Sequence, residues 1–354
     1  MNSKERVAAA LACRVPDRVP FVLAMVDAEL QEAVIGRKLI RHRLDLRFIP
    51  GLIYRPGDPA PKIPANCLVN PEFARFLELD AVGLQFPIPL FCEATLGRGG
   101  YSVIQGLVRS SADLESLRFP DVDAEAPYRE AERFLGEVKG EFAVFAAIRL
   151  GLAPTILSLG YENFCYRLSD DPGLIQELFR LYSDWITRLI QNLCQVSFDF
   201  FWCYDDLAYR SAPLFSPSVF DRLFRDRLCN TARHIQVPWI FHSDGNVVPL
   251  LDSLLTLGMS GLHPLEPGAM DLGKLKMEYG RRLCLVGNID VDYTLSQARE
   301  DEVEEVVHDR IRQLAPGGGY ILSDSNSVPY YCKAANIIAM ANAVRRYRSV
   351  YQPG

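Results

Sequence analysis

Short apolar runs recur along the second half of the chain, and each run ends in a group of polar residues. Four of these units cover residues 239–246, 261–266, 283–290 and 320–326, and helix-like stretches separate most of them. A short apolar strand, a polar tip and then a helix is the repeating unit of a parallel α/β fold. The chemistry of such folds gathers at the carboxyl ends of the strands, so the polar tips form the candidate active site.

The same pattern extends into the first half of the chain and predicts eight parallel strands, beginning near residues 21, 81, 142, 198, 239, 261, 283 and 320. Eight strands that alternate with helices can close into a (β/α)8 barrel and leave no exposed edge. A doubly wound open sheet is the alternative. However, the Gly-rich turn at residues 97–100 has the wrong spacing for a nucleotide-binding loop and follows no clear strand. We therefore predict a single barrel domain over residues 1–354.

Helices are predicted where apolar residues recur at helical spacing. The clearest begins after Asp171-Pro172, a capping side chain followed by proline in the first turn. Others are expected at about 3–13, from about 126, from 217, and over about 247–257 and 301–314. Residues 36–70 hold five prolines and are too long for a plain connection, so they are expected to form a lid or partner surface. Residues 36–141 are expected to be elaborations over the barrel mouth.

Composition narrows the class of protein. The chain has 354 residues, a hydrophobic content of 49% and a net charge of −6, so it can bury a large core and gives no reason to expect a nucleic acid or a membrane surface as partner. No apolar run approaches the ~18 residues of a membrane span, and the amino terminus lacks a secretory stretch. The nine cysteines are scattered without a CxxC pair, which favours the reduced cytoplasm.

Two of the five histidines, His242 and His263, fall at predicted strand tips that are separated by one βα unit. Neighbouring barrel strands lie ~5 Å apart, so the two imidazoles can reach a common point. The alternative for each is a histidine that joins loops by hydrogen bonds. Glu266 follows His263 by three residues, where a loop could turn its carboxylate inward.

Carboxylates and amides fill the other tips. Asp205 and Asp206 close the fourth strand, and one of them should face the barrel mouth while the other caps the next segment. Asp244 could also cap a helix. The remaining polar tip residues could bind substrate or join a loop network; they are Asn288, Asp290, Ser323, Asp324 and Asn326. Imidazole with oxygen ligands and no thiolate favours a borderline or hard divalent ion. Metal-free proton transfer by a histidine and a carboxylate is the other use, and the residues alone leave both open.

Several segments resemble the uroporphyrinogen decarboxylase superfamily. They are Pro16-Asp-Arg-Val-Pro20, Tyr204-Asp-Asp-Leu-Ala208, Phe241-His-Ser-Asp-Gly-Asn246, Leu283-Cys-Leu-Val-Gly-Asn-Ile-Asp290 and Ala315-Pro-Gly-Gly-Gly-Tyr-Ile-Leu322. The resemblance runs from the first predicted helix to the end of the chain and implies a single (β/α)8 barrel. It leaves the reaction open, because the superfamily includes porphyrinogen decarboxylases and corrinoid-dependent methyltransferases.

The decarboxylase alternative lacks its expected groups. Those enzymes carry an essential aspartate seven residues after the Asp-Ala that matches Asp80-Ala81, where this chain has Pro87. Their arginine-rich segment after the first strand is replaced by residues 23–29, and their late histidine by Ser325-Asn326. The cationic partners for a substrate with many carboxylates are therefore missing.

The methyltransferase members offer a closer match. Their thiol-methylating representatives bind zinc through a His-x-Cys pair and a later cysteine. Here His242 keeps the histidine, Asp244 replaces the first cysteine, and Asn326 stands near the second. The resemblance thus implies a divalent metal, expected to be zinc, on His242, Asp244, Glu266 and Asn326.

From these residues we formulate a working hypothesis of metal-assisted methyl transfer from an oxygen-bearing donor to a corrinoid on a partner protein. The catalytic candidates are Asp205, His242 and Glu266. The substrate-binding candidates are Asp206, His263, Asn288, Asp290, Ser323 and Asp324. A barrel that binds a tetrapyrrole or small ligand without chemistry is the third alternative, and a homodimer is expected because members of this fold often dimerise.

Overall fold

The computed structural model describes residues 1–39, 51–97 and 100–351. Residues 40–50 of the predicted lid lie outside the described part of the chain. A curled, mostly parallel sheet forms the centre, in the order β13-β12-β11-β10-β7-β6-β3-β2. Its strands are β2 (Asn66–Cys67), β3 (Ala81–Gln85), β6 (Ala143–Ile148), β7 (Phe200–Tyr204), β10 (Trp239–His242), β11 (Gly261–His263), β12 (Cys284–Ile289) and β13 (Tyr320–Asp324). The predicted α/β barrel-like class is confirmed, with polar residues directly after β6, β7, β10, β12 and β13.

The prediction of a first strand at residues 21–25 is wrong in detail. This segment makes two isolated parallel bridges to the last strand region, Phe21 to Leu322 and Val26 to Val328. On its other side, β2 pairs antiparallel with β3 and occupies the hydrogen-bonding edge that a first strand would need. Residues 20–26 therefore close the barrel between β13 and β3 through single contacts. One is the 2.7 Å hydrogen bond from the Asp80 N–H to the Phe21 carbonyl.

Aromatic side chains fill the barrel interior below its carboxyl end. The rings of Phe145, Phe200 and Trp202 lie 5.1–6.3 Å apart and are fully buried. Gly83 of β3 makes room for them, because a Cβ atom there would lie 2.2 Å from the Phe145 ring. These contacts fill the lower interior and leave the polar groups at the mouth.

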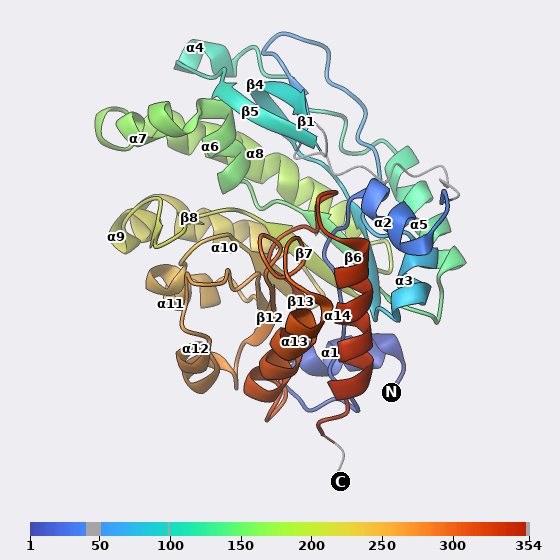
Figure 1. Cartoon of the computed structure of the whole chain (residues 1–354). Helices are drawn as coiled ribbons and strands as arrows, with labels where there is room; N and C mark the ends of the chain where they lie inside the picture. Colours follow the sequence, from blue (N-terminus) through green and yellow to red (C-terminus); the bar gives the residue numbers. More distant parts are fainter. Residues whose placement is uncertain (40–50, 98–99, 352–354) are drawn as a thin grey trace.

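Helices cover the outside of the sheet (Figure 1). They are α1 (Ser3–Leu11), α2 (Ala28–Ile35), α3 (Pro71–Leu77), α5 (Ala126–Glu137), α6 (Leu152–Leu159), α7 (Tyr161–Asp170), α8 (Pro172–Leu193), α9 (Pro217–Phe220), α10 (Asp226–Ala232), α11 (Leu251–Leu255), α12 (Leu272–Tyr279), α13 (Glu300–Leu314) and α14 (Ala334–Tyr347). The predicted start of α8 is confirmed, since the Asp171 carboxylate accepts a hydrogen bond from the Leu174 N–H. A π-helical turn at Asp221–Arg225 separates α9 from α10, and a 3-10 turn at Val248–Leu250 precedes α11. Among the described helices, none is both long and apolar enough to cross a bilayer.

A second sheet lies above α6 at the top of Figure 1. It joins β1 (Leu52–Tyr54), β4 (Pro89–Gly97) and β5 (Gly100–Gly106) in the order β1-β4-β5, and the short helix α4 (Ser111–Leu114) follows it. Gly106 lets β5 approach α6 closely, because a Cβ atom there would lie 2.2 Å from the Leu159 carbonyl carbon. The strand predicted at residues 101–104 is part of β5. A small hairpin of β8 (Ala208–Tyr209) and β9 (Ala212–Pro213) follows β7.

Candidate active site at the barrel mouth

Two histidines lie side by side at the carboxyl ends of β10 and β11. His242 and His263 are paired in the strand register, so their side chains emerge at the same level on the same face. Their Nδ1 atoms are 2.7 Å apart, and the ring centroids are separated by 4.9 Å. Both side chains are buried, and burial lowers the pKa of His242 to about 4 and the pKa of His263 well below its usual range. Both imidazoles are therefore neutral near pH 7.

A chain of hydrogen bonds fixes the tautomers of these two neutral rings. His263 Nε2 lies 3.2 Å from the backbone carbonyl oxygen of Asp324, which can only accept, so this nitrogen carries the hydrogen. The Nδ1 atom of His263 then accepts from Nδ1–H of His242. The remaining nitrogen, His242 Nε2, is left with a free lone pair.

Two carboxylates face this lone pair. Asp206 Oδ1 lies 3.5 Å from His242 Nε2, and Asp244 Oδ1 lies 3.6 Å from it. One potential ligand atom from each of Asp206, His242 and Asp244 lies within 4.8 Å of the others. Asp244 Oδ1 is buried and has no hydrogen-bond partner among the described residues. Asp206 Oδ1 accepts a 3.3 Å hydrogen bond from the Asp244 N–H, and no side-chain donor joins the three acceptor atoms within the described residues. A cation would stabilise this arrangement.

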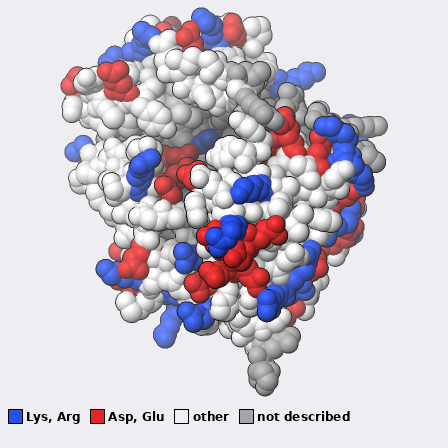
Figure 2. Space-filling model, in the orientation of Figure 1, with Lys and Arg blue, Asp and Glu red and all other residues white. Residues whose placement is uncertain are grey.

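Burial is the main cause that raises the pKa of the Asp244 carboxyl, and the charges of Asp206 and Glu266 raise it further. Three carboxyl groups, those of Asp206, Asp244 and Glu266, thus lie close enough to influence one another. Figure 2 shows acidic side chains in the hollow between the upper part of the molecule and the barrel below it. This charge favours a cation over an additional anion at the three converging atoms.

Two of the predicted metal ligands have other partners. Glu266 Oε2 accepts a 2.6 Å hydrogen bond from the Gly245 N–H, and Glu266 does not belong to the converging cluster. Gly245 is required there, since its φ is +73° and a Cβ atom would lie 2.8 Å from the Arg210 nitrogen. Asn326 donates from Nδ2 to Asp244 Oδ2 at 2.9 Å and accepts from the Ser327 N–H with its amide oxygen. Asn326 therefore orients Asp244 in this arrangement.

Asp205 and Asp206 have different surroundings, and Asp205 caps α6 rather than the segment that follows β7. The Asp205 carboxylate is fully buried and accepts hydrogen bonds from the N–H groups of Leu152 and Ala153 at 3.1 and 2.9 Å. It thus binds the amino terminus of α6, and burial raises its pKa to about 6. Of the two aspartates, Asp206 lies beside His242, with Oδ1 3.5 Å from His242 Nε2.

The remaining candidates divide between the barrel mouth and its loops. Asn288 is buried and donates to the Leu265 carbonyl oxygen at 2.7 Å, while its own Oδ1 lacks a partner among the described residues. Asp290 accepts from the N–H groups of Asp292 and Tyr293 and so stabilises its own loop. Ser323 donates to Asp324 Oδ1, and Asp324 Oδ2 is buried without a partner in the described part of the chain. Burial raises the pKa of Asp324 to about 7.

Arg149 and Tyr204 also belong to the site, although neither is among our predicted site residues. Arg149 directly follows β6 and lies 3.9 Å from Asp206 Oδ2, and the Tyr204 ring lies 4.9 Å from the His242 ring. The strand-tip rule that selected the other residues applies equally to Arg149. Tyr204 ends an apolar strand and looks like a core residue in the sequence.

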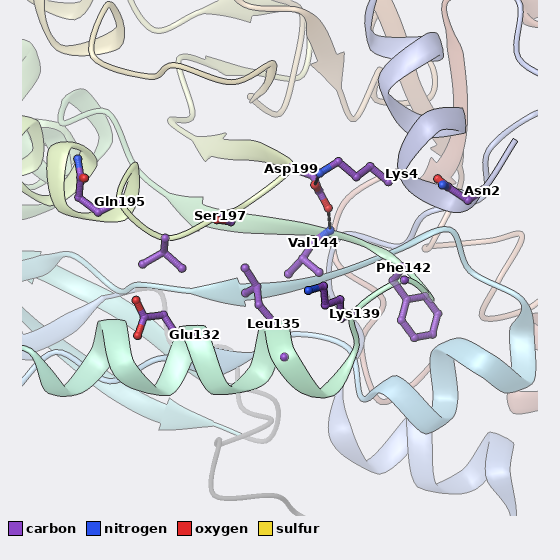
Figure 3. A pocket seen from close by; sticks show the side chains of 13 residues that line it. Asn2, Lys4, Glu132, Leu135, Lys139, Phe142, Val144, Gln195, Ser197 and Asp199 are labelled. Carbon is purple, nitrogen blue, oxygen red and sulfur yellow. Dashed lines mark hydrogen bonds and ion pairs between the residues drawn. The ribbon is translucent and has the colours of Figure 1, made fainter.

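A cavity of 270 Å³ opens beside this cluster, lined by Arg149, Asp206, residues of α6, Val103 and Tyr161. A larger cavity of 520 Å³ lies elsewhere, between α1, α5 and the amino ends of β6 and β7. Figure 3 shows Lys4 and Asp199 side by side at its edge, and the two form a 2.6 Å ion pair. This second cavity is at the opposite end of the barrel from the histidines and does not contribute to the site.

The fold and this cluster define a parallel α/β barrel with a histidine–carboxylate site at its mouth. The family model of uroporphyrinogen decarboxylase (URO-D) matches residues 75–347, and the chain belongs to this family. A solved methyltransferase from Methanosarcina mazei is 18% identical, with a TM-score of 0.71 over 98% of this chain and 99% of that one. A B12-independent methionine synthase from Shewanella sp. W3-18-1 is 12% identical, with a TM-score of 0.49 over 84% of this chain and 98% of that one. A comparison with curated protein sequences gives no match.

Proposed function

We propose that this protein is a methyltransferase in which Asp206, His242 and Asp244 hold a divalent metal ion, with zinc as the expected ion. The observation that carries the proposal is the convergence of three acceptor atoms, one of which is the lone pair of His242 Nε2. Nitrogen and oxygen ligands of this kind bind Zn²⁺ in catalytic sites that keep a position open for substrate. The proposed ligand set replaces Glu266 and Asn326 of our sequence hypothesis with Asp206.

The substrate of the proposed reaction is a small molecule with a methyl group on oxygen. An ion held by Asp206, His242 and Asp244 would supply Lewis acidity to that oxygen. The oxygen would then keep the electron pair of the C–O bond, and reduced corrinoid on a partner protein would accept the methyl group. The fold likeness to a methyltransferase and the absence of thiolate at the converging atoms support this choice. Without thiolate ligands the ion remains a harder Lewis acid, which suits an oxygen atom.

The protein's own groups have distinct tasks in this proposal. His263 keeps the lone pair of His242 directed at the two carboxylates. Asn326 holds one oxygen of Asp244 and leaves the other free. Asp205 fixes the start of α6 next to Asp206 and thereby acts as a positioning residue.

Metal analysis of protein purified without chelator tests the site. We expect about one equivalent of zinc or a similar ion in the wild type and loss of most of it in His242→Ala, because a ligand is removed. The surface variant His308→Ala should keep the metal. Glu266→Gln should also keep it, since its amide can still accept from Gly245. A native protein that binds no metal after zinc is added back would contradict the proposal.

A methyl-transfer assay separates the proposal from its alternatives. Protein, reduced corrinoid carrier and a panel of methoxylated compounds should give demethylated product, with His242→Ala reduced at least 100-fold. Formation of coproporphyrinogen from uroporphyrinogen would instead support the decarboxylase. Ligand-induced thermal stabilisation without any turnover would support a binding barrel.

A further inference from the structure

We infer that Arg149 binds a carboxylate group of the substrate in the 270 Å³ cavity beside Asp206, so that the methyl donor is a small carboxylic acid with an apolar body. This inference rests on the proposed function for the identity of the donor. The carboxylate site itself follows from the surroundings of Arg149 and does not depend on methyl transfer.

Arg149 has hydrogen-bonding capacity that the protein leaves unused. A guanidinium carries five N–H donors. Nη1 donates to the Tyr204 carbonyl oxygen at 3.2 Å, and this is the hydrogen bond that the guanidinium makes within the described residues. The side chain is 12% exposed and lines the cavity, and none of its other nitrogen atoms is among the buried polar atoms without a partner, so a ligand in the cavity can reach them. A ligand that fills the cavity is the natural acceptor for them.

The acidic neighbours of Arg149 do not take up these donors. Asp206 Oδ2 lies 3.9 Å away, beyond hydrogen-bond distance, and Asp206 Oδ1 faces His242. Both oxygens of Asp205 accept backbone N–H groups at the start of α6. With a cation bound between Asp206 and Asp244, their negative charge would be compensated, and the guanidinium would keep its attraction for an incoming anion.

The cavity walls indicate the rest of the ligand. Ala153, Ile156 and Leu157 of α6 supply aliphatic surface, Val103 of β5 adds to it, and Tyr161 contributes an aromatic ring. A planar carboxylate matches the guanidinium fork, while an alkyl chain or ring suits the aliphatic wall. A volume of 270 Å³ admits a molecule of the size of a substituted benzoate and is small for a tetrapyrrole.

Equilibrium binding of two matched probes tests this assignment. We would titrate the full-length protein, loaded with zinc, with 3-methoxybenzoate and with 3-methoxybenzamide by calorimetry. The two probes share size and methoxy group but differ in charge. We expect the acid to bind about 10- to 100-fold more tightly than the amide, because a charge-assisted pair forms in a largely buried site.

Variants of two arginines then identify the charge that causes the preference for the acid over the amide. Arg149→Met should remove the preference for the acid and leave the affinity for the amide nearly unchanged, while Arg149→Lys should retain part of the preference. Arg188→Met is the matched control, because Arg188 lies on the exposed face of α8 and pairs with Asp123. Thermal denaturation of each variant verifies that it is folded, and Arg149→Lys keeps the test informative if Arg149→Met does not fold.

Repeating both titrations after metal removal identifies the group that binds the carboxylate. Retention of at least part of the acid preference without metal, together with its loss in zinc-loaded Arg149→Met, supports the assignment, even for a protein that transfers no methyl group. Equal affinities for acid and amide in the wild type would overturn it. A preference that vanishes with the metal but survives in Arg149→Met would also overturn it, since the ion would then be the carboxylate's partner.

Discussion

At the residue scale, the arrangement of the site depends on one backbone carbonyl group. The Asp324 carbonyl selects the hydrogen position on His263, and His263 in turn selects the hydrogen position on His242. The result is a lone pair on His242 Nε2, the form in which imidazole binds a metal ion. Within the part of the chain that the structure describes, the hydrogen bond of His242 Nδ1 goes to His263.

Substitution of His263 should therefore weaken metal binding without removing a ligand. We expect His263→Phe to lower the zinc affinity about 10- to 100-fold, since His242 loses the acceptor that orients it. His263→Gln, whose amide oxygen can accept from Nδ1–H, should recover part of this loss. Competition with a chromophoric chelator measures the affinity, and His308→Phe on the surface serves as control. Wild-type affinity in His263→Phe would show that the tautomer does not depend on His263.

Asp324 gives a prediction about stability and pH. Its pKa is raised by burial to about 7, compared with 3.8 for an ordinary aspartate, so the folded protein holds this proton more tightly than the unfolded chain. The unfolded state therefore binds fewer protons between about pH 4 and pH 7, and the contribution of this group to stability is lost as the pH rises through that window. Above pH 7 the folded state carries the full cost of an ionised, buried carboxylate.

Asp324→Asn should remove this cost. Its amide oxygen can keep the hydrogen bonds from Ser323 and the Ala24 N–H, and its amide nitrogen replaces the oxygen that has no partner. We expect the variant to be more stable than the wild type at pH 8, by about 2 kcal/mol or more, and nearly equal at pH 4. Urea denaturation of metal-free protein at both pH values measures the difference. The same difference in unfolding free energy between Asp324→Asn and the wild type at both pH values would contradict the titration argument.

Some contacts of the site could be predicted from the sequence, and others could not. Side chains of a strand alternate between its faces, so Tyr204 and Asp206 share one face, while Asp205 points to the other. This alternation was available in the sequence and selects Asp206 for the mouth. The pairing of Glu266 with Gly245 and of Asn326 with Asp244 was not available, because it depends on loop conformations that no periodicity encodes.

At the scale of elements, the parallel strands were predictable because buried strands in a barrel are short apolar runs that end abruptly in polar residues. The prediction of a strand at residues 21–25 failed for a reason that lies outside this segment. Residues 21–25 are apolar enough for a strand, but the antiparallel β2 takes the edge of β3 beside them. Two residues of β2, Asn66 and Cys67, lie in a proline-rich stretch and carry no strand signal.

The cavity beside Asp206 was beyond prediction for a related reason. Its walls come from β5, α6 and α7 and from the residues after β6 and β7, which are up to about one hundred residues apart in the chain. The close approach of β5 to α6 at Gly106 brings Val103 over the cavity. A long-range contact of this kind depends on which glycine faces which helix, and local pattern does not specify it.

At the scale of the whole molecule, a buried ion pair holds the segment that closes the barrel. Arg6 of α1 donates from Nη1 to Asp80 Oδ1 at 2.6 Å, and both side chains are almost completely buried. The other carboxylate oxygen of Asp80 accepts from the Phe21 N–H at 2.9 Å. Asp80 therefore links α1, the start of β3 and the segment at residues 20–26, where the regular strand ladder is interrupted.

Arg6→Met should weaken this closure and lower the free energy of unfolding by about 3 kcal/mol. The buried Asp80 carboxylate loses the guanidinium that donates to it and keeps Arg18, whose Nη2 lies 3.6 Å away. Arg345→Met removes an exposed ion pair with Glu78 and should cost at most about 1 kcal/mol. Urea denaturation measures both. The metal content of the folded Arg6→Met protein should stay at the wild-type value. Asp206, His242 and Asp244 follow β7 and β10, which lie in the middle of the sheet order and away from the closure between β13 and β3. A loss of metal in the folded variant would mean that closure at residues 20–26 also sets the geometry of the mouth. Asp324 would then be the connecting residue, because its carboxylate accepts from the Ala24 N–H and its carbonyl from His263.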